Sequence, residues 1–122
     1  MNDNQTTISE LRRLVTEFVA QRRWEKYHDA KNLSMAVAIE AAELMEHFQW
    51  ARSEELDELL ADPDLRARVT DEVADIACFT LALAITLDID LAAAIEQKMR
   101  KNALKYPAEQ FQGHYYKPTD QQ

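Results

Sequence analysis

Two stretches of the chain are apolar on nearly every side of a helix, which predicts central helices, yet each contains a pair of acids. The stretches cover residues 33–50 and 63–87. Residues three apart lie on one helical face, so the carboxylates of each pair point the same way. If the two helices pack together, four carboxylates can offer oxygen ligands to a divalent cation. The pairs are Glu40 with Glu43 and Glu72 with Asp75.

Composition supports an all-α fold in a single domain over residues 1–122, with an ordered core at about 7–110. Of 122 residues, 47% are hydrophobic, one is glycine and three are proline, which favours long helices with few turns. The tail from Gln112 is expected to be frayed. A net charge of -8 argues against a nucleic-acid polymer as partner, because such binding uses a basic surface.

Helix start signals divide the chain into four long helices and one short acidic helix. A capping box begins the first helix, and a cap followed by proline begins the third. The signals are, in chain order, Thr7 with Glu10, Asn32, Ser53 for the short helix, Asp62 with Pro63, and Asp88 or Asp90. The last helix should end before Pro107.

No segment predicts contact with a membrane. The N-terminus lacks the basic and apolar order of a secretory signal, and the apolar run at residues 76–87 is shorter than a membrane span. We therefore expect a cytoplasmic protein without a membrane partner. The single cysteine, Cys78, is expected to be a buried, inert thiol.

The residue types in the acidic pairs favour Mg²⁺, with Mn²⁺ as a possible substitute. Zinc sites recruit cysteine or histidine, and a ferritin-like di-iron site would require Glu-x-x-His pairs that this chain lacks. The alternative is that the acids cover solvent-exposed helix faces. Apolar neighbours make that reading less favourable for Glu40 and Glu43. His47 has no comparable partner in sequence and is expected at the surface.

Positive charge gathers near the end of the last long helix. Lys98, Asn102 and Lys105 fall at i, i+4 and i+7, a spacing that can hold several phosphate oxygens on one face. Tyr106 follows directly. The alternative is a solvated basic turn that complements the helix dipole.

The ordered set of motifs resembles the MazG-type all-α nucleoside triphosphate pyrophosphohydrolases, and within them the dCTP pyrophosphatase branch. Together the motifs span most of the chain, from about Ile8 to Pro107. They are Trp24-Glu25-Lys26-Tyr27-His28, Asn32-Leu33, Glu40-Ala41-Ala42-Glu43-Leu44, Phe48-Gln49-Trp50, Glu72-Val73-Ala74-Asp75-Ile76, Asp90-Leu91, and Lys98-Met99 through Asn102 to Lys105-Tyr106-Pro107.

The resemblance implies a four- to five-helix bundle, completed by assembly into a homodimer or homotetramer. It implies Mg²⁺-dependent hydrolysis of a nucleoside triphosphate substrate to the monophosphate and pyrophosphate, with Glu40 or Glu43 orienting the water. The implied site residues are Glu40, Glu43, Glu72 and Asp75 for metal, Lys98, Asn102, Lys105 and Tyr106 for phosphates, and Trp24, His28, Asn32 and Trp50 for the base.

Two positions depart from the family pattern. Ile39 stands where broader relatives often carry an acid, which favours the dCTPase-like branch. Phe79 stands where some members of that branch have tyrosine, which leaves base selectivity open. Two alternatives therefore remain: a non-catalytic helical dimerisation or regulatory protein, and a related pyrophosphohydrolase acting on dUTP or modified nucleotides. The main prediction, hydrolysis of a nucleoside triphosphate, implies that the protein controls or cleans up the nucleotide pool.

Overall fold

The computed structural model describes residues 1–114, which contain six α-helices, two short 3₁₀ helices and no strand. The predicted all-α class is therefore confirmed for these residues, whereas residues 115–122 of the predicted frayed tail lie outside them. The helices are α1 (Ile8–Gln21), η1 (Glu25–Tyr27), α2 (Ala30–Glu46), η2 (Ser53–Glu55), α3 (Leu56–Leu60), α4 (Pro63–Thr86), α5 (Leu91–Lys105) and α6 (Ala108–Phe111).

Local capping explains where α1, α4 and α5 begin. The backbone N–H of Thr7 donates to Oε2 of Glu10 at 2.6 Å, and the N–H of Glu10 donates back to the Thr7 hydroxyl at 3.1 Å. Asp62 and Asp90 accept hydrogen bonds at the starts of α4 and α5. Each cap satisfies an N–H group that the helix itself cannot pair. These three predicted starts are confirmed.

The predicted start and end of α2 are wrong. Asp29 is the N-cap, and its Oδ1 accepts the backbone N–H of Asn32 at 2.8 Å, so Asn32 lies inside the first turn. At the other end, the N–H groups of His47 and Phe48 donate to carbonyls three residues earlier. This tighter pattern is typical of a terminating helix, and α2 ends at Glu46 rather than at Trp50.

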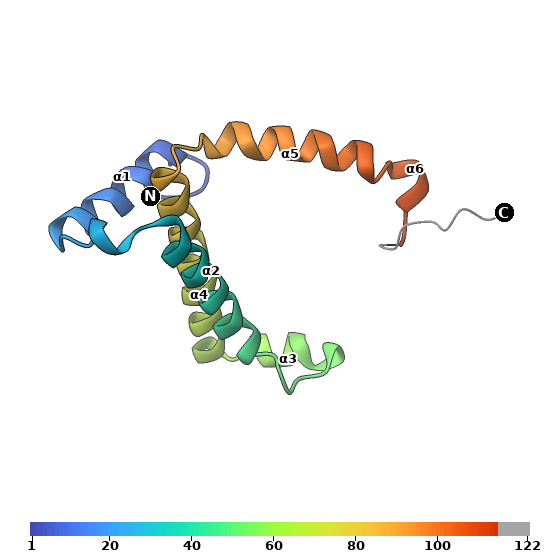
Figure 1. The fold of residues 1–122 in the computed structure, drawn as a ribbon. Coiled ribbons are helices and arrows are strands. Elements are labelled where there is room, and N and C mark those ends of the chain that lie inside the picture. Colours follow the sequence, from blue (N-terminus) through green and yellow to red (C-terminus); the bar gives the residue numbers. More distant parts are fainter. Residues whose placement is uncertain (115–122) are drawn as a thin grey trace. The chain divides into compact units, whose positions relative to one another are not determined.

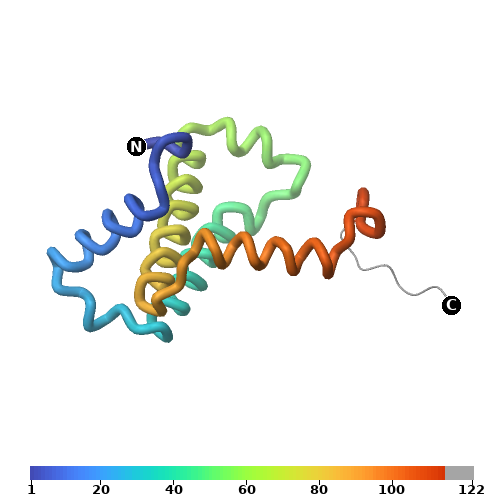
Figure 2. The backbone as a smooth tube through the Cα atoms, turned by 90° about the horizontal axis from the view of Figure 1, so that it is seen from above, coloured from blue at the N-terminus to red at the C-terminus, as the bar shows by residue number. Residues whose placement is uncertain are grey.

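The chain divides into two compact units, residues 1–89 and residues from Asp90 onward. In the first unit α2 packs along α4, while α1 and α3 contact α4 toward its two ends (Figure 1). The view in Figure 2 also places α2 beside α4. The prediction of a single domain over the whole chain stays a prediction.

The hydrophobic core of the described residues is small and lies mainly where α4 meets α1 and α2. Its buried members are Val19, Leu33, Leu81, Ala82 and Ala84. Two hydrogen bonds hold the surrounding segments in place. Arg12 donates to the carbonyl of Ile89 at 2.8 Å, and the Thr86 hydroxyl donates to the carbonyl of His28 at 3.2 Å. The second bond ties the segment between α1 and α2 to the end of α4.

In the second unit, α5 is followed by a turn and the single-turn helix α6. The Tyr106 and Phe111 rings meet edge to face, with centroids 5.2 Å apart, and the Tyr106 N–H donates to the Asn102 carbonyl at 2.7 Å. Among residues 1–114, no single helix is long and apolar enough to cross a membrane, although α4 and α5 taken together meet the length and composition criteria.

Candidate metal and nucleotide site

Packing of α2 against α4 brings three predicted metal ligands together. One carboxylate oxygen from each of Glu40, Glu43 and Glu72 lies within 4.8 Å of the others. Glu40 and Glu43 come from consecutive turns of α2, and Glu72 comes from α4. These atoms are close enough to contact one cation, and their convergence is the arrangement that the i, i+3 spacing predicts if the helices pack.

Glu40 has the most unusual environment in this cluster. It is half-buried, and its buried Oε2 has no hydrogen-bond partner among the described residues. Burial is the main cause that raises the pKa of Glu40 to about 7. Contacts with the carboxyl groups of Glu43 and Glu72 favour the protonated form as well, and the charges of Glu43 and Asp75 add to the effect. A cation bound to the cluster would favour the ionised form of Glu40 and so oppose these causes.

Asp75, the fourth predicted ligand, lies beside this cluster without belonging to its closest group. It is exposed, and its negative charge contributes to the raised pKa of Glu40. It also lines a neighbouring cavity. Asp75 therefore connects the acidic cluster with that cavity, through one turn of α4.

The donor set fits a hard divalent cation. All three clustered ligands are carboxylates, which suit Mg²⁺ or Mn²⁺ better than zinc. The buried, unpaired Oε2 of Glu40 is a second sign of fit, because an isolated buried acceptor is costly unless something satisfies it. The group can hold a metal.

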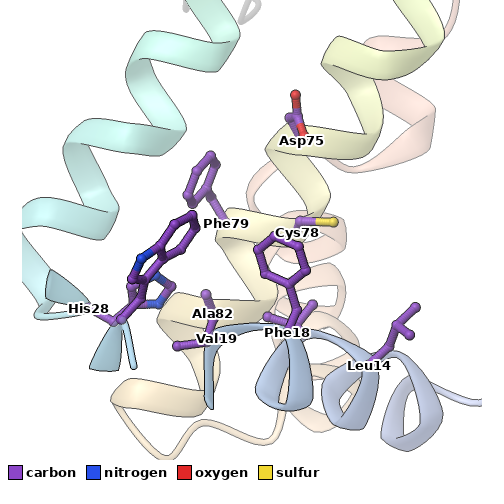
Figure 3. Close-up of a pocket in the computed structure, with 10 residues that line it drawn as sticks. Leu14, Phe18, Val19, His28, Asp75, Cys78, Phe79 and Ala82 are labelled. Carbon is purple, nitrogen blue, oxygen red and sulfur yellow. The ribbon is translucent and has the colours of Figure 1, made fainter. Parts of the chain in front are cut away.

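A cavity of about 380 Å³ opens next to the cluster, between α1, α4 and the segment that joins α1 to α2. Its wall is mostly apolar, as Figure 3 shows, with Phe79 and Cys78 projecting from α4 and Phe18 from α1. Asp75 lies about one turn before Cys78 and Phe79 on α4. The remaining lining residues are Leu14, Val15, Val19, Trp24, His28 and Ala82.

Two predicted base-binding residues, Trp24 and His28, line this cavity. Trp24 packs edge to face against Phe18, with ring centroids 5.8 Å apart, and remains 43% exposed. The Arg22 guanidinium lies 3.7 Å from the centroid of the Phe18 ring. The Arg22 cation therefore stabilises the aromatic wall, and Trp24 remains accessible to a planar ligand.

The other two predicted base-binding residues lie elsewhere. Asn32 uses its side-chain amide to donate to the Tyr27 carbonyl and to Oδ2 of Asp29, both at 3.2 Å, so it holds the segment before α2. Trp50 is 88% exposed and does not line the cavity.

The predicted phosphate ligands all belong to the second unit. Lys98, Asn102 and Lys105 occupy α5, and Tyr106 follows it. The ammonium group of Lys105 lies 5.3 Å from the centroid of the Tyr106 ring. These residues extend from the middle of α5 to the residue that follows it, and their phosphate-binding role stays a prediction.

The chain is similar to known proteins in both sequence and fold. The model of the MazG-like family matches residues 35–120. The chain belongs to the MazG-like family. It is 38% identical to dCTP pyrophosphatase 1 of Bos taurus over 117 residues, which cover 96% of this chain and 69% of the relative. It is 37% identical to dCTP pyrophosphatase 1 of Rattus norvegicus, over 93% of this chain and 67% of that relative.

The fold is similar as well. The crystal structure of a pyrophosphatase from Archaeoglobus fulgidus DSM 4304 superposes with a TM-score of 0.78 and 38% identity, covering 88% of this chain and 98% of that one. The family resemblance predicted from the motifs is therefore confirmed.

Two residues of this MazG-like chain lie in places that the sequence interpretation missed. Cys78 is exposed and lines the cavity, whereas the sequence predicted a buried thiol. Partial loss of water around the thiol, together with the charge of Asp75, raises its pKa. His47 is only 19% exposed and lies 3.5 Å from Glu72. The spacing could have indicated that His47 lies near the acidic cluster, because it follows Glu40 by seven residues and so lies near the same helical face.

Proposed function

We propose that this chain hydrolyses a nucleoside triphosphate, dCTP or a close analogue, between the α and β phosphates, releasing the monophosphate and pyrophosphate. One observation carries the proposal: a three-carboxylate cluster able to hold a cation adjoins an aromatic-walled cavity, and Asp75 borders both. Membership of the MazG-like family and the dCTP pyrophosphatase relatives support the same reaction.

In this proposal Glu40, Glu43, Glu72 and Asp75 hold Mg²⁺, which Mn²⁺ can replace. When bound, the ion supplies charge neutralisation of the phosphates and a lowered pKa for the attacking water. Glu40 or Glu43 orients that water and accepts its proton. Support comes from the buried Oε2 of Glu40, which has no hydrogen-bond partner among the described residues and can accept a hydrogen bond from that water.

The cavity would hold the base. Trp24 and His28 offer faces for stacking of a pyrimidine, and Phe79 adds an apolar surface without a hydroxyl. Asn32 and Trp50 remain assigned to base binding in this proposal. Asn32 would act by holding the segment that carries His28, whereas Trp50 requires a neighbouring surface because it is 88% exposed.

The triphosphate would also require cations from the protein. Lys98, Lys105, Asn102 and Tyr106 would hold the β and γ phosphates through charge-assisted hydrogen bonds. Their i, i+4 and i+7 spacing along α5, with Tyr106 directly after it, supports a joint role. The residues that line the cavity include no lysine or arginine, so the positive charge for the phosphates has to come from outside it.

A homodimer or homotetramer would complete the fold. The exposed face of α2 carries an apolar stripe, in which Met35, Ile39 and Met45 are 48%, 58% and 70% exposed. Ala38 and Ala42 lie between them on the same face and are exposed too. Continuous apolar surface of this kind marks an interface, and a second copy of this chain is the occupant that we assign to it.

The test of the reaction is a panel of nucleoside triphosphates with Mg²⁺, in which pyrophosphate release is measured for each. The proposal expects the highest turnover with dCTP or a close analogue, and strong loss in Glu43→Gln and Asp75→Asn. Glu58→Gln and Asp57→Asn, which remove exposed acids of α3, are matched controls and should keep full turnover. Full turnover in both site variants would contradict the site assignment, and preference for dUTP or a modified nucleotide would contradict the substrate.

The test of assembly is sedimentation equilibrium of the whole chain. Met35→Glu places a charge in the exposed apolar stripe and should shift the protein toward monomer, whereas Glu46→Gln on the same helix should not. A wild-type chain that is a stable, fully active monomer would overturn the oligomer.

A further inference from the structure

The His47 side chain lies against one of the three clustered carboxylates, that of Glu72. His47 is the C-terminal cap of α2, and its backbone N–H donates to the carbonyl of Leu44 at 3.3 Å. Its imidazole Nε2 lies 3.5 Å from Oε1 of Glu72. The two side chains are 19% and 18% exposed, so little water competes for this contact.

We propose that His47 is a positioning residue that holds the Glu72 carboxylate in its metal-binding orientation. This inference rests on the proposed function, because it assumes that Glu72 binds a cation there. A carboxylate has two oxygens, so an imidazole at Oε1 leaves Oε2 available to the ion. Neutral imidazole with its proton on Nε2 is a sufficient donor, and the ring does not need to carry a charge.

The need for such a partner follows from how the cluster is built. Glu40 and Glu43 come from adjacent turns of one helix, whereas Glu72 reaches the same point from α4. Its neighbours in the cluster are also acids, which repel it when no ion is bound. His47 is the group with an N–H donor that the structure places against Glu72. Partners of this kind orient metal ligands and raise metal affinity.

His47 does not itself belong to the group of atoms that converge within 4.8 Å. Its nitrogen faces Glu72 across a distance of 3.5 Å, at the outer limit for a hydrogen bond. The contact therefore supports a role through Glu72 rather than direct coordination. Removal of the imidazole should lower metal affinity without removing a ligand.

The test measures binding of Mn²⁺ alone to the full chain, by electron paramagnetic resonance of free Mn²⁺. His47→Phe keeps a ring of similar size but removes the donor, and we expect the Kd for Mn²⁺ to rise by about tenfold. His47→Gln places an amide N–H close to the former Nε2 and should restore most of the affinity. His47→Asn places its amide nearer the former Nδ1 and should not. Glu46→Gln, at the preceding exposed position, is the control.

The outcomes separate the two proposals. If the wild-type chain does not bind Mn²⁺, the metal site of the proposed function is wrong and this inference falls with it. If the wild type binds and His47→Phe binds equally well, only the inference is wrong. If His47→Phe does not fold, as shown by circular dichroism, the Gln and Asn variants decide: equal affinities overturn the inference, and a difference in favour of Gln supports it.

Discussion

The acidic cluster and the neighbouring cavity both include residues of α4, but the cluster is made of carboxylates and the cavity wall is mostly apolar. In the cluster, three carboxylates converge and the buried Oε2 of Glu40 has no hydrogen-bond partner. The cavity is walled mostly by apolar and aromatic side chains. The cluster therefore requires a charged ligand, whereas the cavity only offers a shape. This difference predicts that cluster variants change the chemistry and that cavity variants change binding.

Glu43→Gln should have the largest effect. The substitution removes a negative ligand while keeping the side chain's length, so pyrophosphate release should fall by about 10²-fold or more. Steady-state kinetics with saturating nucleotide and Mg²⁺ measure this directly. Glu58→Gln should leave the rate unchanged. A comparable rate in both variants would show that the cluster is not where the chemistry occurs.

Stability of the metal-free protein should depend on pH through Glu40. Its pKa is about 7 in the folded chain against an ordinary value of 4.5, so between these values the folded state binds more protons than the unfolded state. The free energy of unfolding should then fall as the pH rises through this window. Thermal unfolding in the presence of a chelator, from pH 5 to pH 8, measures it.

Glu40→Gln is the decisive variant for that effect. Because the amide cannot ionise, most of the fall in stability between pH 5 and pH 8 should disappear, and the metal-free variant should be more stable than wild type at pH 8. Saturating Mg²⁺ should flatten the wild-type profile as well. An unchanged profile in Glu40→Gln would assign the pH dependence to other groups.

Trp24→Leu should act on binding rather than on the chemical step. Loss of a stacking face costs about 1–3 kcal/mol per base, so the KM for nucleotide should rise roughly tenfold while kcat changes less. Arg22→Ala, which removes the guanidinium that lies over the Phe18 and Trp24 rings and donates to the Phe18 carbonyl, is a milder comparison. A large fall in kcat with an unchanged KM would contradict the division between cluster and cavity.

Phe79→Tyr should give the smallest change. The new hydroxyl would enter the apolar wall of the cavity and can form one additional hydrogen bond, worth about 0.5–1.5 kcal/mol. The ratio of kcat/KM values for dCTP and dUTP should therefore shift by less than about tenfold. Equal ratios in both proteins would show that this position does not contact the base.

Much of the helix plan was readable from neighbouring residues. Thr7 with Glu10, Asp62 and Asp90 each cap a helix where predicted. The prediction failed at Asn32, because Asp29 lies only three residues earlier and competes for the same role. Residues that can all cap a helix are distinguished by how the preceding segment packs, which local sequence does not record.

The sequence by itself determined the helices and the pairing of acids within each, because capping and the i, i+3 spacing act over one or two turns. Only the tertiary structure decided that Glu72 meets Glu40 and Glu43, that His47 faces Glu72, and that Cys78 lines a cavity while Trp50 is exposed. These relations depend on how α2, α4 and α1 pack. Side chains on different helices meet at distances set by that packing, and not by their separation along the chain.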